Sequence, residues 1–282
     1  MLAFDSKQLT VTPLGSAVGA QIDKLDINRC SEAQLQALKR ALATFGVLVL
    51  PEQQLQPQQQ VDFAQRLGEI NINRFFKASD EHPLIAEVRK EAHQKANIGS
   101  SWHTDHSYDQ QPALGSILYA KELPPAGGDT LFQSMHAAWA SLSDGLKHVV
   151  AGLRAKHSSR HVFGQSKPEF DGRLLNPEQA TQDAVHPMVI KHPESGQSIL
   201  YVNPQFTVGI EGWHKAESDA LLQYLYQQAL QPEYGCRVRW QKNTLVIWDN
   251  RSTWHRALND YPGHARLMHR ITLEGGPLQA AG

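Results

Sequence analysis

Short apolar segments separated by turn residues recur from residue 114 onward, and they restrict the folds that the chain can adopt. Their spacing is fairly even, and few of them alternate with helical segments. This pattern favours a barrel or a two-layer jelly roll. We expect strands at 114–123, 129–135, 186–193, 197–203, 236–240, 244–250 and 265–275.

Helical patterns precede these strands and interrupt them twice. The segment 31–46 opens with a capping-box pattern and closes at a glycine, and 57–68 opens with a proline at a plausible first helical position. Two further helical segments cover 136–153 and 218–230. We therefore expect a mainly β fold with flanking helices, organised as a single domain over residues 1–282.

The charge and hydropathy patterns exclude several classes of protein. The chain has 27 Lys and Arg residues against 28 Asp and Glu residues, without a block of like charge, so no nucleic-acid partner is expected. No apolar run approaches the roughly 20 residues of a membrane span, and the first residues lack the pattern of a signal peptide. Only two cysteines are present, far apart in the chain. We expect a cytoplasmic protein, and a homo-oligomer is left open.

The segment 98–110, IGSSWHTDHSYDQ, carries two histidines and two aspartates close together without a helical or strand period. A His-x-Asp triplet is informative when it is extended, because residues two apart on a strand project to the same side. His103 and Asp105 have this spacing, with Thr104 pointing away. These two side chains are therefore candidate metal ligands.

Other histidines must be weighed against this pair. His192 and Glu194 have the same spacing, but Pro193 marks a turn there, and we interpret the segment as a loop. A facial iron site needs a second histidine as its third ligand. The best candidate is His255, just beyond an apolar strand, although His255 and His269 can also be read as surface residues from the local sequence.

Three blocks of sequence together resemble the taurine dioxygenase family. They are WHTD, then LPPAGGDTLF, then IWDNRSTWHRALNDYPGHARLMHR, in the family's order. The resemblance extends from TPLGSAVGAQI to HRITLEG and so covers most of the chain. The family consists of Fe(II)- and 2-oxoglutarate-dependent oxygenases, among them the enzyme that cleaves 2,4-dichlorophenoxyacetate. The resemblance implies a double-stranded β-helix, or jelly roll, with helices packed outside.

The resemblance also implies the metal ligands. His103, Asp105 and His255 match the family's 2-His-1-carboxylate triad, which would hold Fe(II) and leave one face for 2-oxoglutarate and O2. Related halogenases lack the carboxylate, so its presence here favours hydroxylation. Trp102 and Tyr108 would pack around the ligands and form pocket walls.

Two further residues match the family's positions for the cosubstrate. Arg266 would neutralise the distal carboxylate of 2-oxoglutarate, since a guanidinium meets both carboxylate oxygens and stays charged when buried. Thr130 would add a hydroxyl donor. Without the resemblance, Arg266 would be an ordinary charge at a strand edge and GGDT an ordinary turn.

The prime substrate is expected to be a small organic anion. Arg270 should point to the same side as Arg266, and in the family this arginine holds the anionic group of the substrate. Taurine-cleaving members carry a histidine where Asn73 stands and an asparagine where Gly99 stands, so taurine itself is not expected. The residues that align with apolar pocket walls, each of which could also be core, are Phe76, Phe163 and Phe206.

Two neighbours of the metal triplet, His106 and Asp109, are also polar. His106 either lines the substrate pocket, or contacts a pocket residue from outside the pocket, or lies at the protein surface. Asp109 is interpreted as a solvated turn residue. Two alternatives to the oxygenase also stay open. One is a cupin-like metal-dependent hydrolase or isomerase, which would not need Thr130 and Arg266. The other is a non-catalytic ligand-binding barrel, which should have lost a metal ligand.

The implied reaction is the oxidative decarboxylation of 2-oxoglutarate to succinate and CO2, coupled to hydroxylation of the anion. If the hydroxylated carbon bears a sulfonate, sulfate or ether oxygen, the product would fragment. The protein would contribute orientation and a dry site, while the iron carries the chemistry.

Overall fold

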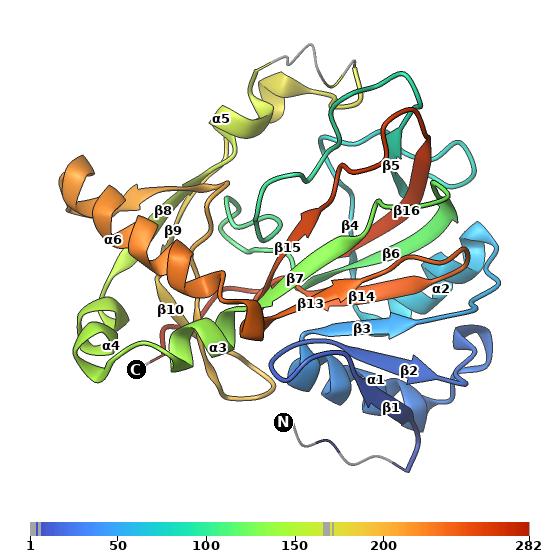
Figure 1. Ribbon diagram of the computed structural model, residues 1–282, viewed down its shortest axis with the longest axis horizontal. Helices are drawn as coiled ribbons and strands as arrows, with labels where there is room; N and C mark the ends of the chain where they lie inside the picture. The colour runs from blue at the N-terminus through green and yellow to red at the C-terminus, as the bar shows by residue number, and fades with distance from the viewer. Residues whose placement is uncertain (1–3, 5–6, 166–169, 171, 282) are drawn as a thin grey trace.

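The computed structural model describes residue 4, residues 7–165, residue 170 and residues 172–281 (Figure 1). Its largest sheet has the strand order β1-β2-β3-β14-β6-β16-β4, with β5 also paired to β16. The strands of this large sheet are β1 (Thr10–Pro13), β2 (Ala20–Asp23), β3 (Val47–Leu50), β4 (Ile70–Asn71), β5 (Ala86–Lys90), β6 (Gly115–Glu122), β14 (Leu245–Asp249) and β16 (Arg266–Leu273).

The central strand β6 explains how the large sheet separates two cores. Its first six residues are all buried, and their side chains alternate between the two faces. Ile117 and Tyr119 belong to one hydrophobic cluster, whereas Leu118 and Ala120 belong to another. The second of these clusters includes Phe132, which lies on a different sheet. The large sheet is therefore covered on both faces.

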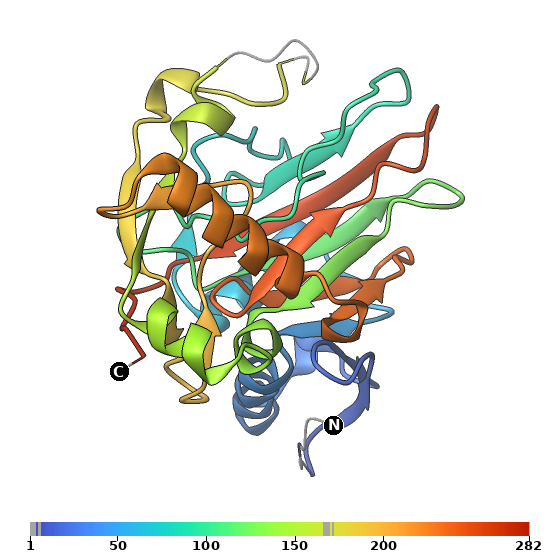
Figure 2. The same cartoon turned by 60° about the vertical axis from the view of Figure 1, so that its left-hand side comes forward.

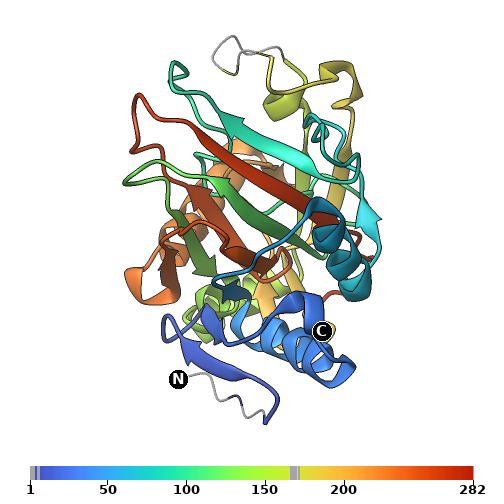
Figure 3. The same cartoon turned by 90° about the vertical axis from the view of Figure 1, so that its right-hand side faces the viewer.

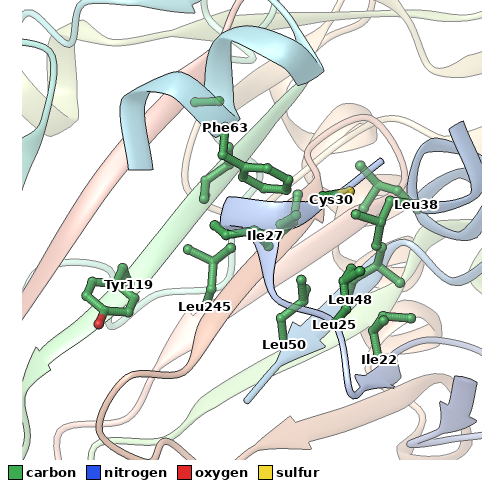
Figure 4. Packing of buried hydrophobic residues seen from close by; sticks show 14 of the residues in the cluster. Ile22, Leu25, Ile27, Cys30, Leu38, Leu48, Leu50, Phe63, Tyr119 and Leu245 are labelled. Carbon is green, nitrogen blue, oxygen red and sulfur yellow. The ribbon is translucent and has the colours of Figure 1, made fainter. Parts of the chain in front are cut away.

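Two helices cover the outer face of the large sheet (Figure 3). They are α1 (Glu32–Phe45) and α2 (Pro57–Leu67), and Leu38 and Phe63 from these helices pack with strand residues such as Leu245 (Figure 4). The apolar residues of each helix lie on the face that meets the sheet. This core holds the sheet whose other face carries the cavity described below.

The opposite face of the large sheet meets a second layer (Figure 2). This layer is a three-stranded antiparallel sheet in the order β13-β7-β15, formed by β13 (Gly235–Val238), β7 (Thr130–Ser134) and β15 (Thr253–Ala257). The remaining strands are β12 (Thr207–Ile210), β8 (Arg154–Ser158) and β9 (Asp183–Pro187), in that order in one sheet, and the pair β10 (Val189–Lys191) and β11 (Ser198–Leu200).

The other helices lie around this second layer. They are α3 (Met135–Ala140), α4 (Asp144–Ala151), α5 (Arg160–Phe163) and α6 (Lys215–Ala229). The 3-10 turns are η1 (Ile27–Arg29), η3 (Pro177–Gln179) and η4 (Pro232–Tyr234), of which η1 packs in the outer core with α2. Among the helices that the structure describes, none combines the length and the apolar character of a membrane-spanning segment.

The mainly β architecture with flanking helices confirms the sequence-based expectation, and each of the seven expected strand segments contains a strand. The capping box at Ser31 and the left-handed Gly46 that ends α1 are also present. The expected helix over 136–153 is wrong as a single helix. It is divided into α3 and α4 because Ser143 caps a new helix, accepting a hydrogen bond from the backbone of Leu146.

Candidate active site

His103 and His255 come from distant parts of the chain and lie directly opposite each other. Their backbones exchange two hydrogen bonds, from His103 N to His255 O at 3.2 Å and from His255 N to His103 O at 2.8 Å. His255 belongs to β15, where it is paired with Phe132 of β7. The two imidazole ring centroids are 4.1 Å apart. The extended geometry expected for the His-x-Asp segment is thus present at its first residue.

Asp105 completes a cluster of three buried side chains. Its Oδ1 lies 3.6 Å from His103 Nε2, and its Oδ2 lies 3.6 Å from His255 Nε2. One donor atom from each residue falls within 4.8 Å of the others. Two imidazoles and one carboxylate on one side of a cavity match the ligand set of a non-haem Fe(II) site with open positions. The residues present therefore fit the metal that the sequence implies.

The hydrogen bonding of the two histidines leaves their Nε2 atoms available to a metal. His103 Nδ1 donates to the carbonyl oxygen of Ser101 at 2.7 Å, which leaves its Nε2 lone pair free. His255 Nδ1 has no hydrogen-bond partner within the described residues. Burial and the neighbouring His103 hold the pKa of His255 well below its usual range. A neutral imidazole is the form that binds a metal.

Asp105 is ionised in this setting. Burial alone raises the pKa of its carboxyl group, but the guanidinium of Arg270 and the two imidazoles outweigh burial and hold the pKa well below its usual range. Arg270 Nη2 lies 2.7 Å from Asp105 Oδ2. The arginine expected to hold the substrate is thus also a partner of the expected metal ligand.

Arg266 presents unpaired donors to the same cavity. Its side chain is buried, and its Nε and Nη2 have no hydrogen-bond partner in the part of the chain that the structure describes. Burial lowers the pKa of this guanidinium. A buried cation with unused donors is costly unless an anion arrives to pair with it. This arrangement fits a carboxylate ligand such as that of 2-oxoglutarate.

Thr130 and Trp240 complete the surroundings of Arg266. The guanidinium carbon lies 5.7 Å from the centroid of the Trp240 ring, and Trp240 Nε1 donates to Thr130 Oγ1 at 3.0 Å. Because an indole can only donate, the Thr130 oxygen accepts, and its own hydrogen can be donated to a ligand. A Cβ atom at Gly128, where φ is +72°, would lie 3.3 Å from Arg266 Cδ. The sequence GGDT therefore lets the backbone approach the arginine.

A cavity of about 350 Å³ joins these groups, a volume typical of small-molecule sites. The expected metal ligands, Thr130 and both arginines line it. The expected substrate residues that also line it are Asn73, Phe76, His106, Phe163 and Phe206. The apolar residues that sequence reasoning missed include Val88, Ile98, Leu118, Val162 and Leu174. They come from five different segments, and no local pattern marks them.

The interpretation of Asp109 as a solvated turn residue is wrong. Its carboxylate accepts two hydrogen bonds from Arg74 Nη2, at 2.6 and 2.7 Å, and lies 3.0 Å from His106 Nδ1. His106 is buried, and its Nε2 lies 3.4 Å from Asn73 Nδ2. His106 therefore both lines the cavity and belongs to a chain of polar contacts behind it.

The direction of the hydrogen bonds in this chain is fixed by the backbone. Phe75 N and Phe76 N donate to Asn73 Oδ1 at 2.9 and 3.1 Å, so the Asn73 nitrogen must face His106. His106 Nε2 then accepts, and its Nδ1 donates to Asp109. One hydrogen of the Asn73 amide stays available to the cavity.

The two aromatic residues near the ligands have different positions. Tyr108 is buried in the cavity wall, with its ring centroid 4.9 Å from that of Phe206 and 5.9 Å from that of Phe163. Trp102 packs against the hydrophobic cluster around α3 and α6 instead. Tyr108 thus agrees with its expected role as a wall, whereas Trp102 agrees only with the packing role.

The segment around His192 is a turn, as expected, but its histidine is not an ordinary loop residue. His192 is 1% exposed, and its Nε2 lies 3.0 Å from Asp249 Oδ2. Arg251 forms hydrogen bonds with both Asp249 and Glu194. Because Arg251 donates to both acids and His192 lies against Asp249, this cluster is a hydrogen-bonded ion-pair network that ties the turn to the end of β14.

Comparisons with known proteins agree with the geometry. The sequence model of the taurine catabolism dioxygenase TauD, TfdA family matches residues 10–272. An alkylsulfatase from Acinetobacter baylyi is 33% identical, over 96% of this chain and 86% of that protein. An alpha-ketoglutarate-dependent sulfate ester dioxygenase from Pseudomonas putida is 30% identical, over 95% of this chain and 90% of that protein.

A solved structure supports the same assignment of the fold. A taurine dioxygenase from Burkholderia xenovorans superposes with a TM-score of 0.81 at 31% identity, covering 96% of this chain and 93% of that chain. The expected jelly-roll, or double-stranded β-helix, fold is thereby confirmed.

Proposed function

The chain belongs to the taurine catabolism dioxygenase TauD, TfdA family, and from this premise we propose how its residues divide the work of the reaction. The protein is an Fe(II)- and 2-oxoglutarate-dependent dioxygenase that hydroxylates a small organic anion and releases succinate and CO2. When bound, the iron supplies the place where 2-oxoglutarate and O2 react. The chain's own side chains bind, orient and shield the reactants.

His103, Asp105 and His255 are the proposed ligands of Fe(II). The observation that carries this proposal is the convergence of one carboxylate and two imidazoles, all buried, at the wall of the cavity. The hydrogen bond from His103 Nδ1 to Ser101 O supports the same role, because it orients Nε2 toward the other two ligands.

Arg266 and Thr130 are the proposed partners of 2-oxoglutarate. The buried guanidinium of Arg266 offers Nε and Nη2 without protein partners among the described residues, and the Thr130 hydroxyl hydrogen is free to donate beside it. A metal-dependent hydrolase or isomerase of the cupin type would have no use for this unpaired cation. A non-catalytic barrel would have no use for a complete set of metal ligands. Both alternatives are therefore less favoured.

The charges in the cavity favour a singly charged substrate. With Fe(II) and the 2-oxoglutarate dianion bound, the formal charges of Asp105, Arg266 and Arg270 leave one net positive charge. A monoanion neutralises it, whereas a dianion leaves an excess negative charge in a buried site. A carboxylate, sulfonate, sulfate ester or singly protonated phosphonate fits this condition. Arg270 would hold the charged group, and Asn73 would donate its remaining amide hydrogen.

The body of the substrate is proposed to be an alkyl or aryl group. Phe76, Phe163 and Phe206 line the cavity, and such apolar walls supply most of the affinity in sites of this kind. Gly99 also lines the cavity and offers no side chain to the amine of taurine. The sulfate ester and alkylsulfate chemistry named for the relatives agrees with an anion of this type.

We expect Arg270→Met to impair substrate turnover far more than 2-oxoglutarate binding. Loss of a hydrogen-bonded charge typically costs about 1.5–3 kcal/mol, which corresponds to about 10–150-fold in kcat/KM for the anion. Steady-state kinetics and a 2-oxoglutarate titration measure the two effects separately, and slow uncoupled consumption of 2-oxoglutarate should persist. Efficient turnover of a neutral molecule, or of taurine, without dependence on Arg270 would contradict the role of this residue.

The direct test of the proposed function is a screen of organic anions for succinate release in the presence of Fe(II), 2-oxoglutarate and O2. The panel should pair each alkyl or aryl body with a carboxylate, a sulfonate, a sulfate ester and a neutral alcohol. We expect anion-dependent succinate release that the alcohols do not support. Release that is equal for anions and alcohols would refute the anionic substrate class.

The organisation of the protein in the cell follows from the same reasoning. We propose one catalytic domain over residues 1–282, a cytoplasmic location, and a small-molecule anion as partner without nucleic acid or membrane. Formation of a homo-oligomer is left open.

A further inference from the structure

Ser116 lies beneath the proposed metal site on the central strand β6. Its side chain is fully buried, and its Oγ lies 3.2 Å from Asp105 Oδ2, 3.0 Å from Arg270 Nη2 and 3.4 Å from Asn250 Nδ2. The strand can come this close to β14 because a Cβ atom at Gly115 would lie 2.5 Å from the Trp248 carbonyl oxygen. One small hydroxyl thus joins a proposed metal ligand, the proposed substrate arginine and a buried amide.

The direction of each hydrogen bond at Ser116 follows from its partners. Trp248 Nε1 donates to Asn250 Oδ1 at 2.8 Å, so the Asn250 amide must turn its nitrogen toward Ser116. The guanidinium of Arg270 can only donate. The Ser116 oxygen therefore accepts from both, and its single hydrogen is directed to Asp105 Oδ2.

The two carboxylate oxygens of Asp105 have different hydrogen-bond partners. Oδ2 accepts from both Ser116 and Arg270, at 3.2 and 2.7 Å, so its lone pairs are occupied by protein donors. Oδ1 is left as the oxygen that can bind a metal. A carboxylate held through one oxygen keeps more of the metal face open than one that chelates through two.

We infer that Ser116 is a positioning residue that orients Asp105 as a ligand through one oxygen and ties it to Arg270. The inference rests on the proposed function, since it assumes that Asp105 binds a metal. Ser116 itself would not bind the metal. Its hydroxyl would fix the orientation of the Asp105 carboxylate and connect it to Arg270, the proposed substrate residue. Hydrogen-bond partners of metal ligands typically affect metal affinity by about 10–100-fold.

The test is the affinity of the full-length protein for Mn(II), measured from the electron paramagnetic resonance signal of the free ion, with and without 2-oxoglutarate. We expect Ser116→Ala to raise the dissociation constant about tenfold or more. Ser116→Cys replaces the hydroxyl with a slightly larger thiol that is a weaker hydrogen-bonding group, so it should give an intermediate value and carries the test if the alanine variant does not fold.

A matched control separates positioning from stability. Ser218 on α6 is similarly buried, and its hydroxyl accepts only the backbone N–H of Ile210 among the hydrogen bonds described for it. Ser218→Ala should lower the melting temperature without changing the Mn(II) dissociation constant. Wild-type affinity in Ser116→Ala, or in the folded Ser116→Cys variant where alanine fails, would overturn the role of Ser116 alone. A wild-type protein that does not bind Mn(II) would overturn the proposed metal site as well.

Discussion

Replacing His255 with alanine should weaken Fe(II) binding by more than about 100-fold and abolish hydroxylation. The loss of a ligand is expected to exceed the about 10–100-fold cost of losing an outer hydrogen-bond partner. Without His255, only His103 and one oxygen of Asp105 remain as donors, because Ser116 and Arg270 occupy the other oxygen of Asp105. Equilibrium titration with Fe(II) under anaerobic conditions measures the change.

The control for His255→Ala is a substitution of a histidine far from the proposed metal site. His148 is exposed on α4, and His148→Ala should bind Fe(II) as the wild type does. Asp105→Ala should abolish hydroxylation even if some iron remains bound, because it also leaves Arg270 without its carboxylate partner. If His255→Ala binds Fe(II) with wild-type affinity, the assignment of the three ligands is incorrect.

Arg266→Ala should weaken the binding of 2-oxoglutarate by about 2–5 kcal/mol, or about 30–4,000-fold in the dissociation constant. The reason is that the guanidinium is buried, and no protein group among the described residues pairs with its Nε and Nη2. Removing it leaves the distal carboxylate of 2-oxoglutarate desolvated and unpaired. Titration with 2-oxoglutarate in the presence of Mn(II) measures the effect without turnover.

Two further variants should weaken 2-oxoglutarate binding less than Arg266→Ala does. Arg266→Lys keeps the charge but not the planar fork, so its affinity should lie between those of the wild type and the alanine variant. Thr130→Val should cost less, about 1.5–3 kcal/mol for one hydrogen bond to a charged group. Arg160, which is exposed and paired with Asp183, offers a control in Arg160→Ala. Equal 2-oxoglutarate affinities for wild type and Arg266→Ala would contradict the role of this arginine.

Local sequence patterns predicted much of the fold and part of the site. His103 and Asp105 could be selected because their spacing is informative on an extended segment. Arg266 was selected from the family resemblance, and its even spacing to Arg270 on one strand then placed both on the same side. In the structure, these four residues line one cavity. The spacing of apolar segments was likewise enough to predict the mainly β architecture, because turn residues separate the strands visibly.

The contacts that sequence could not predict are those between distant segments. Asp109 looked solvated because its partner Arg74 lies on another segment, and nothing local marks that pairing. Ser116 was not singled out from the sequence, since its role depends on Asp105 and Arg270 meeting at its hydroxyl. Such groups are found only when the topology brings their elements together. The glycine that precedes Ser116 was the one local sign of a close approach.

The most direct test of the account is the anaerobic addition of 2-oxoglutarate to the Fe(II)-loaded protein, followed by visible absorption. A weak charge-transfer band should appear in the wild type, because His103, Asp105 and His255 leave metal positions to which 2-oxoglutarate can bind beside Arg266. Arg266→Ala should need far more 2-oxoglutarate to produce the same band, and His255→Ala should not produce it. A wild-type protein that binds Fe(II) without giving the band, or an unchanged band in His255→Ala, would contradict the account.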